Sequence, residues 1–221
     1  MAARITEVGI MARRIRPLTP QRVAELPDAC GCCGFWESPD HAQPRCGAVC
    51  DPGRLEVWVE TVLQEWGDCG RVIYMDGAAI GFAKYAPARF FPQVVSMAAG
   101  PPSEDAVLLA CLHVDSEVRH AGVGKVLLQA VLRDLASRGE RTVEAYASTE
   151  MLDRRSSPMI TVEFLLRQGF TVVRPHPRYP LMRLELKSLA AWTDNIEAVL
   201  ESLQLPLLRR EPAPAPLAGS R

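Results

Sequence analysis

Apolar and polar residues alternate along this chain in patterns that predict both helices and strands. Apolar residues recur at helical spacing from Leu55 to Trp66 and from Val126 to Leu135, and a glycine follows each segment. An almost continuous apolar run at 106–114 is typical of a strand buried on both faces. A short helix is expected at 20–26, and shorter strands are expected at 14–18, 142–147, 170–174 and 181–186.

Turn-forming and helix-capping residues refine this picture. The Asp-Gly pair at 76–77 separates strands at 71–74 and 78–85, which predicts a hairpin with a type I′ turn. The Ser-Pro pair at 157–158 predicts the start of a helix that runs to Gly169. Helices and strands thus alternate along the chain, and the predicted fold class is α/β in a single domain.

The domain is expected to span 12–188 and to carry a cysteine-rich insertion at about 30–53. Clusters of glycine, proline and cysteine with little periodicity mark that insertion as irregular. A leader at 1–11 is expected to be disordered, and Met1 and Met11 are alternative starts. After the domain we expect a C-terminal helix at 189–206 and then a disordered Pro/Ala-rich tail at 207–221.

Composition excludes several classes of protein. Twenty-five basic and 26 acidic residues give a net charge of -1, so the chain lacks the positive charge typical of nucleic-acid or anionic-membrane binders. Neither a transmembrane run nor a signal peptide is recognisable in the sequence. We therefore expect a cytoplasmic protein with reduced thiols and with neither nucleic-acid nor membrane partners.

The cysteine-rich segment contains enough ligands for a zinc site, but their spacing differs from the paired Cys-x-x-Cys of zinc ribbons. Phe35 and Trp36 follow the first cysteines, and the segment could instead pack these aromatic rings onto the core. Structural thiols are favoured over a zinc site, redox switching is a smaller alternative, and no metal is expected. The residues concerned are Cys30, Cys32, Cys33, His41, Cys46 and Cys50.

The chemistry is expected where the buried strand at 106–114 ends and the next helix begins. The connecting residues contain Arg-x-x-Gly-x-Gly, formed by Arg119, Gly122 and Gly124. Backbone N–H groups at a helix N-terminus bind phosphate, and glycines allow close approach to them. The spacing fits neither a P-loop nor the dinucleotide-binding Gly-x-Gly-x-x-Gly.

On these residues the chain resembles the GCN5-related N-acetyltransferase (GNAT) family. The family signature is a strand that ends in Leu-x-Val, a short loop, and Arg-x-x-Gly-x-Gly at the start of a helix. A Gly-Phe junction follows further along the chain. The matching residues here are Leu112, Val114, Arg119, Gly122, Gly124, Gly169 and Phe170, within a similarity that extends from about Arg14 to Leu186.

The resemblance implies a mixed, mostly antiparallel, V-splayed sheet flanked by helices. It also implies acetyl-CoA as co-substrate, with its pyrophosphate on the loop and its thioester beside the splayed strand. The implied cofactor-binding residues are Leu112, His113, Val114, Arg119, His120, Ala121, Gly122, Val123, Gly124 and Lys125.

Two catalytic residue types of the family pattern, a tyrosine and a base, are missing from this chain. Many members carry a tyrosine where this chain has Leu165, and a base where it has Leu108 or Ala110. Tyr179, on the last hairpin, is the preferred candidate for the catalytic acid. Tyr146, His113, Cys111 and water remain alternatives, although the strand alternation points His113 and Cys111 away from the acetyl carbonyl.

The resulting hypothesis is an N-acetyltransferase that moves an acetyl group from acetyl-CoA to a primary amine by direct attack. The alternative is a non-catalytic acyl-CoA-binding or sensing module. The acceptor is either a small molecule or a protein amine, and a homodimer through 192–205 is one option for assembly. The sequence leaves the identity of the acceptor open.

Overall fold

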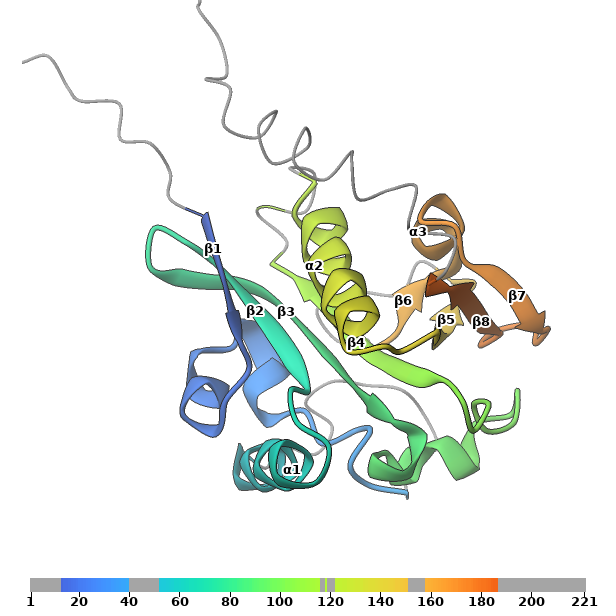
Figure 1. Ribbon diagram of the computed structural model, residues 1–221, viewed down its shortest axis with the longest axis horizontal. Helices are drawn as coiled ribbons and strands as arrows, with labels where there is room; N and C mark the ends of the chain where they lie inside the picture. The colour runs from blue at the N-terminus through green and yellow to red at the C-terminus, as the bar shows by residue number, and fades with distance from the viewer. Residues whose placement is uncertain (1–12, 40–51, 116–117, 119–121, 151–157, 187–221) are drawn as a thin grey trace, which may run out of the picture. The chain divides into compact units, whose positions relative to one another are not determined.

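The computed structural model describes residues 13–39, 52–115, 118, 122–150 and 158–186 (Figure 1). The expected leader at 1–11, C-terminal helix at 189–206 and tail at 207–221 lie outside this part of the chain. The strands are β1 (Arg13–Pro17), β2 (Gly70–Met75), β3 (Ala78–Pro87), β4 (Val107–Val114), β5 (Thr142–Ser148), β6 (Ile160–Thr161), β7 (Thr171–Arg174) and β8 (Leu181–Glu185). The helices are α1 (Pro52–Glu65), α2 (Val123–Ser137) and α3 (Val162–Arg167), with short 3₁₀ helices η1 (Pro20–Glu25), η2 (Asp28–Cys32), η3 (Ala88–Phe90) and η4 (Pro92–Ser96).

The strands form one eight-stranded sheet with the order β1-β2-β3-β4-β5-β8-β7, and β6 pairs with β5. Most neighbours are antiparallel, whereas β4 and β5 are parallel. The predicted α/β class and the mixed, mostly antiparallel sheet are confirmed. The Asp-Gly hairpin is confirmed too, because Asp76 and Gly77 both have positive φ (52° and 87°), as a type I′ turn requires.

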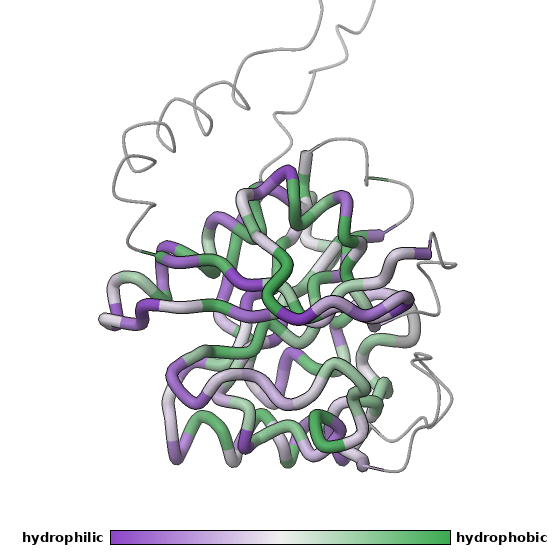
Figure 2. The backbone as a smooth tube through the Cα atoms, turned by 90° about the vertical axis from the view of Figure 1, so that its right-hand side faces the viewer, coloured by the Kyte–Doolittle hydropathy of each residue, from purple (hydrophilic) through white to green (hydrophobic). Residues whose placement is uncertain are grey.

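Helices cover both faces of the sheet (Figure 1). Helix α2 packs on β2, β3 and β4, while α1 packs on η1 and η2. The turns of α1, at the bottom of Figure 2, alternate between apolar and polar residues, as expected of a helix with one buried face. Trp36 is fully buried and stacks on Tyr146 with ring centroids 5.8 Å apart, so the aromatic residues after η2 do pack onto the core.

The predicted helix from 157–158 to Gly169 is corrected at its start. Ile160 and Thr161 instead form the short strand β6, which pairs in parallel with the end of β5. The helix then begins at Val162, and Thr161 caps it by accepting a hydrogen bond from the backbone N–H of Phe164 at 3.4 Å. The helix predicted at 20–26 is also present, as the 3₁₀ helix η1.

The cysteines divide into two groups. Cys30, Cys33, Cys69 and Cys111 are reduced and buried. Cys32 is disulfide-bonded. The expectation of reduced thiols is therefore wrong at this position, because a disulfide depends on the approach of two backbone segments that spacing alone does not reveal. His41, Cys46 and Cys50 lie outside the described residues.

The described residues contain no group of three or more histidine, cysteine or acidic side chains placed to hold a metal ion. None of their helices is long and apolar enough to cross a bilayer.

Candidate functional site

The sheet opens between β4 and β5. Within the described residues these strands pair at Val107 with Val143 and at Leu108 with Glu144, and the pairing ends there. Beyond Leu108 the edge of β4 no longer faces β5, and β6 pairs with the end of β5 instead. The divergence creates a V whose inner wall is the second half of β4.

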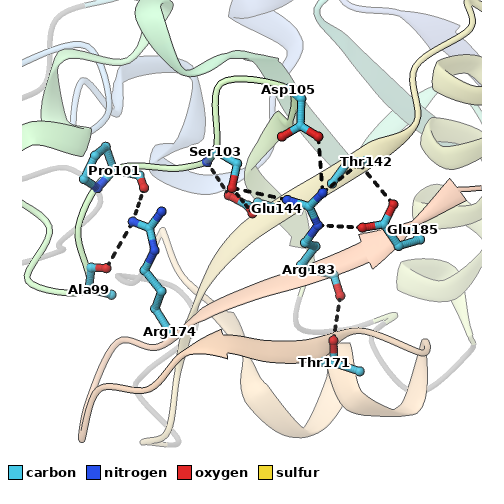
Figure 3. A network of polar contacts seen from close by, with 10 residues as sticks. All are labelled: Ala99, Pro101, Ser103, Asp105, Thr142, Glu144, Thr171, Arg174, Arg183 and Glu185. Atoms are coloured by element: carbon cyan, nitrogen blue, oxygen red, sulfur yellow. Dashed lines mark hydrogen bonds and ion pairs between the residues drawn. The ribbon is translucent and has the colours of Figure 1, made fainter.

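A polar network holds the closed end of this V (Figure 3). The buried carboxylate of Glu144 accepts hydrogen bonds from the backbone N–H and the hydroxyl of Ser103, at 2.8 and 2.9 Å. Arg183 on β8 donates to the same carboxylate at 3.1 Å and forms an ion pair with Asp105 at 3.3 Å. These contacts tie the loop before β4 to β5 and β8, so the point at which the strands diverge is fixed.

A β-bulge sets the direction of the side chains on β4. Lys84 pairs with Cys111 and Tyr85 pairs with Leu109, which leaves Ala110 as the extra residue. Past the bulge, the side chain of Val114 faces α2, since its Cγ2 lies 3.7 Å from the position of a Cβ on Gly124. The side chains of Cys111 and His113 therefore point to the opposite face of the sheet, as the strand alternation predicts.

The N-terminus of α2 lies beside β4. Gly122 immediately precedes this 15-residue helix with φ of 74°, a conformation that favours glycine, and has no side chain to cap it. A Cβ at Gly122 would meet nothing within 4 Å, whereas one at Gly124 would lie 3.6 Å from the ring of Phe164. The first backbone N–H groups of α2 are thus exposed to a space bounded by β4 and α3.

These elements enclose a cleft of about 250 Å³. Several predicted cofactor-binding residues line it, but Val123 is 1% exposed and faces the core. Arg119, His120 and Ala121 lie outside the described residues. The cleft is lined by Leu112, His113, Val114, Gly122, Gly124, Lys125, Met159, Ile160, Thr161, Phe164, Arg167 and Gln168.

Part of this lining was not anticipated from the sequence. Phe164, Arg167 and Gln168 follow the i, i+3, i+4 spacing of one helix face, and this spacing is the signal that could have identified them. Leu165 is fully buried and is not among the lining residues. Neither Leu165 nor Phe164 carries an ionisable proton, so this helix supplies no phenol to the cleft.

Three of the chain's four tyrosines either donate their hydroxyl proton to another group or are fully buried. The hydroxyl of Tyr146 donates to the carbonyl of Gly100 at 2.6 Å, and burial raises its pKa. Tyr74 donates to Glu25, and Tyr85 is fully buried with a raised pKa. The fourth, Tyr179, is half-buried against the core.

Tyr179 does not line the 250 Å³ cleft. Its hydroxyl accepts a hydrogen bond from Arg178 at 3.3 Å, and its ring lies parallel to that of His176. The adjacent backbone runs beside the end of β5, where the N–H of Ala147 donates to the carbonyl of Pro180 at 3.0 Å. The structure thus places Tyr179 near the open side of the V but outside its described lining.

Comparisons with known proteins agree with this architecture. Residues 36–170, more than half of the chain, match the model of the acetyltransferase (GNAT) family. A search of curated protein sequences found no match.

Three similar solved structures illustrate the fold. An N-acetyltransferase from Staphylococcus aureus is 15% identical, with a TM-score of 0.56 over 79% of this chain and 99% of the other. The PaiA N-acetyltransferase from Thermoplasma acidophilum, solved with coenzyme A, is 15% identical, with a TM-score of 0.52 over 79% and 99%. YncA from Salmonella typhimurium, solved with acetyl-CoA, is 16% identical, with a TM-score of 0.54 over 79% and 94%.

Proposed function

The chain belongs to the GNAT family of acetyltransferases, and on that premise we propose that it transfers the acetyl group of acetyl-CoA to a primary amine. The observation that carries the proposal is the junction of the splayed edge of β4 with the open N-terminus of α2 in one cleft. Two solved relatives hold coenzyme A or acetyl-CoA, which supports the same ligand here.

The residues at the helix N-terminus fit a pyrophosphate. Gly122 and Gly124 leave the first turn of α2 accessible, and partial positive charge accumulates at a helix N-terminus. Lys125 is exposed at the same end of the cleft and adds a full positive charge. In this proposal the predicted residues 119–124 hold the pyrophosphate through backbone N–H groups, and Lys125, whose own N–H donates to the carbonyl of Gly122 at 3.1 Å, contributes its side chain.

The splayed strand fits the thioester. Backbone N–H groups of Leu112 to Val114 that are not used by β5 can donate hydrogen bonds to a carbonyl oxygen in the cleft. Such donors stabilise the negative charge that develops when an amine attacks the carbonyl carbon. A new C–N bond then forms, the C–S bond breaks, the nitrogen loses one proton to solvent, and the thiolate of coenzyme A leaves with a proton from the protein or from solvent.

We assign the proton for this thiolate to Tyr179. Tyr74 and Tyr146 donate their hydroxyl protons to other groups and Tyr85 is fully buried, whereas the hydroxyl of the half-buried Tyr179 accepts a hydrogen bond from Arg178. A phenol can act as a general acid toward a departing thiolate.

A non-catalytic acyl-CoA-binding module is the second candidate, favoured by the absence of an ionisable side chain at Leu165 and Phe164. Release of coenzyme A from acetyl-CoA in the presence of amines distinguishes the two functions. An enzyme releases coenzyme A only when an acceptor is added. A binding module takes up acetyl-CoA, measured by calorimetry, and releases none with any amine.

A further inference from the structure

A hollow of about 470 Å³ lies at one edge of the sheet, beside β1. Strand β1 is the first in the sheet order, so among the described residues it pairs only with β2 (Figure 1). Strands β2 and β3 separate it from β4, and the hollow shares no lining residue with the cleft of the candidate site. The charged residues that line this β1 hollow are Arg14, Arg16, Arg22, Glu25 and Asp76.

The three arginines of the β1 hollow form no ion pair with any residue that the structure describes. The carboxylate of Glu25 accepts a hydrogen bond from the hydroxyl of Tyr74 instead, and Asp76 lies in the exposed hairpin turn. Arg22 donates to the carbonyl of Pro17 at 2.9 Å rather than to a carboxylate. Three guanidinium groups around one hollow repel one another, and an anion bound between them relieves that repulsion.

The backbone hydrogen bonds of β1 show which residues face β2. The N–H of Leu18, just after the strand, donates to the carbonyl of Gly70 at 2.9 Å. In an antiparallel pair every second residue bonds to the partner strand, and the register along β1 is unbroken. The backbone groups of Arg16 and Arg14, two and four positions before Leu18, therefore also face β2.

The remaining residues of β1 form the outward edge. Pro17 has no N–H, and its carbonyl already accepts the hydrogen bond from Arg22. A proline is tolerated in an edge strand where its nitrogen points away from the partner strand. The N–H and C=O of Ile15 point outward in the same way, so this part of the edge is open to a further strand.

The side chains of Arg14 and Arg16 are both exposed and, being two residues apart, lie on the same face of β1. Arg14 is paired with Tyr74, which also lines the β1 hollow, so this face borders the hollow. Side chains at alternate positions of a strand are about 7 Å apart. Alternate side chains of any extended peptide have the same spacing.

We propose that this edge binds an extended acidic segment of another protein, which adds a strand beside β1 and places two carboxylates, two residues apart, against Arg14 and Arg16. A guanidinium can donate two parallel hydrogen bonds to one carboxylate. The backbone of the segment pairs with Ile15, as in other cases where a peptide extends an exposed sheet edge. Because Pro17 ends the open edge, the paired stretch is short and the charges supply much of the selectivity. The site is independent of acetyl transfer.

The first test uses the full chain and a capped, fluorescein-labelled peptide, Val-Glu-Val-Glu-Val, with binding followed by fluorescence anisotropy. This peptide should bind at least about tenfold more tightly than Val-Lys-Val-Lys-Val. It should also bind more tightly than Val-Val-Glu-Glu-Val, whose adjacent glutamates point to opposite faces of a strand. Equal affinities, or no binding at millimolar protein, would overturn the proposal. The arginines and Pro17 would then serve only to protect the edge against aggregation.

The second test removes the two exposed charges. Arg14→Gln combined with Arg16→Gln should weaken binding of the acidic peptide at least about tenfold and leave the melting temperature and acetyl-CoA binding unchanged. The matched control is Arg133→Gln combined with Arg141→Gln, which removes the same charge from exposed positions outside the hollow and the cleft. Unchanged binding by the first variant, or an equal loss in the control, contradicts the proposal.

The third test separates strand addition from charge attraction alone. Two peptides each carry one N-methyl group, either on the central valine or on a neighbouring glutamate. Successive amides of an added strand point in opposite directions, so only one of the two methyl groups faces β1. One peptide should lose affinity at least about tenfold while the other keeps it. Equal affinities of the methylated peptides, or displacement of the labelled peptide by glutarate at matched concentrations, would contradict strand addition.

Discussion

Lys84 and Glu37 lie 47 positions apart in the sequence and form an ion pair of 2.5 Å in the interior, with exposed side-chain fractions of 2% and 3%. The pair joins the interior strand β3 to the loop after η2, across the layer that also contains Trp36 and Trp58. Taking two charges out of water is costly, and such a pair is weak evidence for stability by itself.

The energetic signature of this pair can be measured. Lys84→Met or Glu37→Gln alone leaves one buried charge without its partner, and each should lower the free energy of unfolding by about 3–5 kcal/mol. The double variant should recover most of that loss. Urea denaturation of the four proteins gives the coupling energy. Single variants as stable as the wild type would show that the two charges are not held together in solution.

Acetyl-CoA should raise the melting temperature, because a ligand that binds the native state stabilises it by about 2.7 kcal/mol at 100 times its Kd. Gly124→Glu should abolish the shift by placing a carboxylate at the helix N-terminus where the pyrophosphate approaches. A Cβ at Gly124 meets Phe164 and Val114 at 3.6 and 3.7 Å, ordinary contact distances, so Gly124→Ala should fold and serves as the steric control. Normal binding by the glutamate variant would place the ligand elsewhere.

Tyr179→Phe should lower turnover roughly ten- to a hundredfold while leaving the affinity for acetyl-CoA unchanged, the pattern of a group that acts mainly in the transition state. The control is Tyr146→Phe, whose hydroxyl is already bonded to the carbonyl of Gly100. Steady-state kinetics at saturating acetyl-CoA measures both. Wild-type turnover in Tyr179→Phe would remove this residue from the mechanism and leave solvent as the proton source.

Alkaline pH should destabilise the protein partly through its buried thiols. Burial raises the pKa of Cys69 and Cys111 from 9.0 to about 12. Between these values the unfolded chain loses the thiol protons while the folded chain keeps them, so the free energy of unfolding falls as pH rises, by up to about 1.4 kcal/mol per unit for each thiol.

Cys69→Ala tests this slope because Cys69 does not line the cleft. Urea denaturation between pH 8 and 11 under reducing conditions should give a shallower decline for the variant than for the wild type. The buried phenols of Tyr85 and Tyr146, with raised pKa values, contribute equally to both proteins. Identical slopes would mean that the Cys69 thiol is accessible to water in the folded state.

Purified protein without a metal-binding tag should contain well under one zinc per chain, as the irregular spacing of the cysteines predicts. Elemental analysis measures this directly. Near-equimolar zinc that is lost together with structure on chelation would contradict the prediction, because structural zinc is coupled to folding.

Local patterns predicted most of the elements well. The helical spacing of Leu55 to Trp66, the Asp-Gly turn and the apolar run that became β4 each depend on interactions within a few residues. The start of α3 was missed because Ile160 and Thr161 pair with Ala147 and Ser148 of β5, and no signal within 157–162 announces a strand of two residues. Lys84 did leave a signal, as the single charged residue in an otherwise apolar strand.

The sequence by itself determined the type and order of the elements and the glycine-containing turn between Val114 and α2, since periodicity and turn chemistry are properties of short segments. Only the tertiary structure decided that Phe164 would border the cleft and that Glu37 would reach Lys84. It also decided that the half of β4 that carries Leu112 and Val114 would diverge from β5. Those relationships arise from the packing of distant segments and the divergence of two strands, which no local pattern encodes.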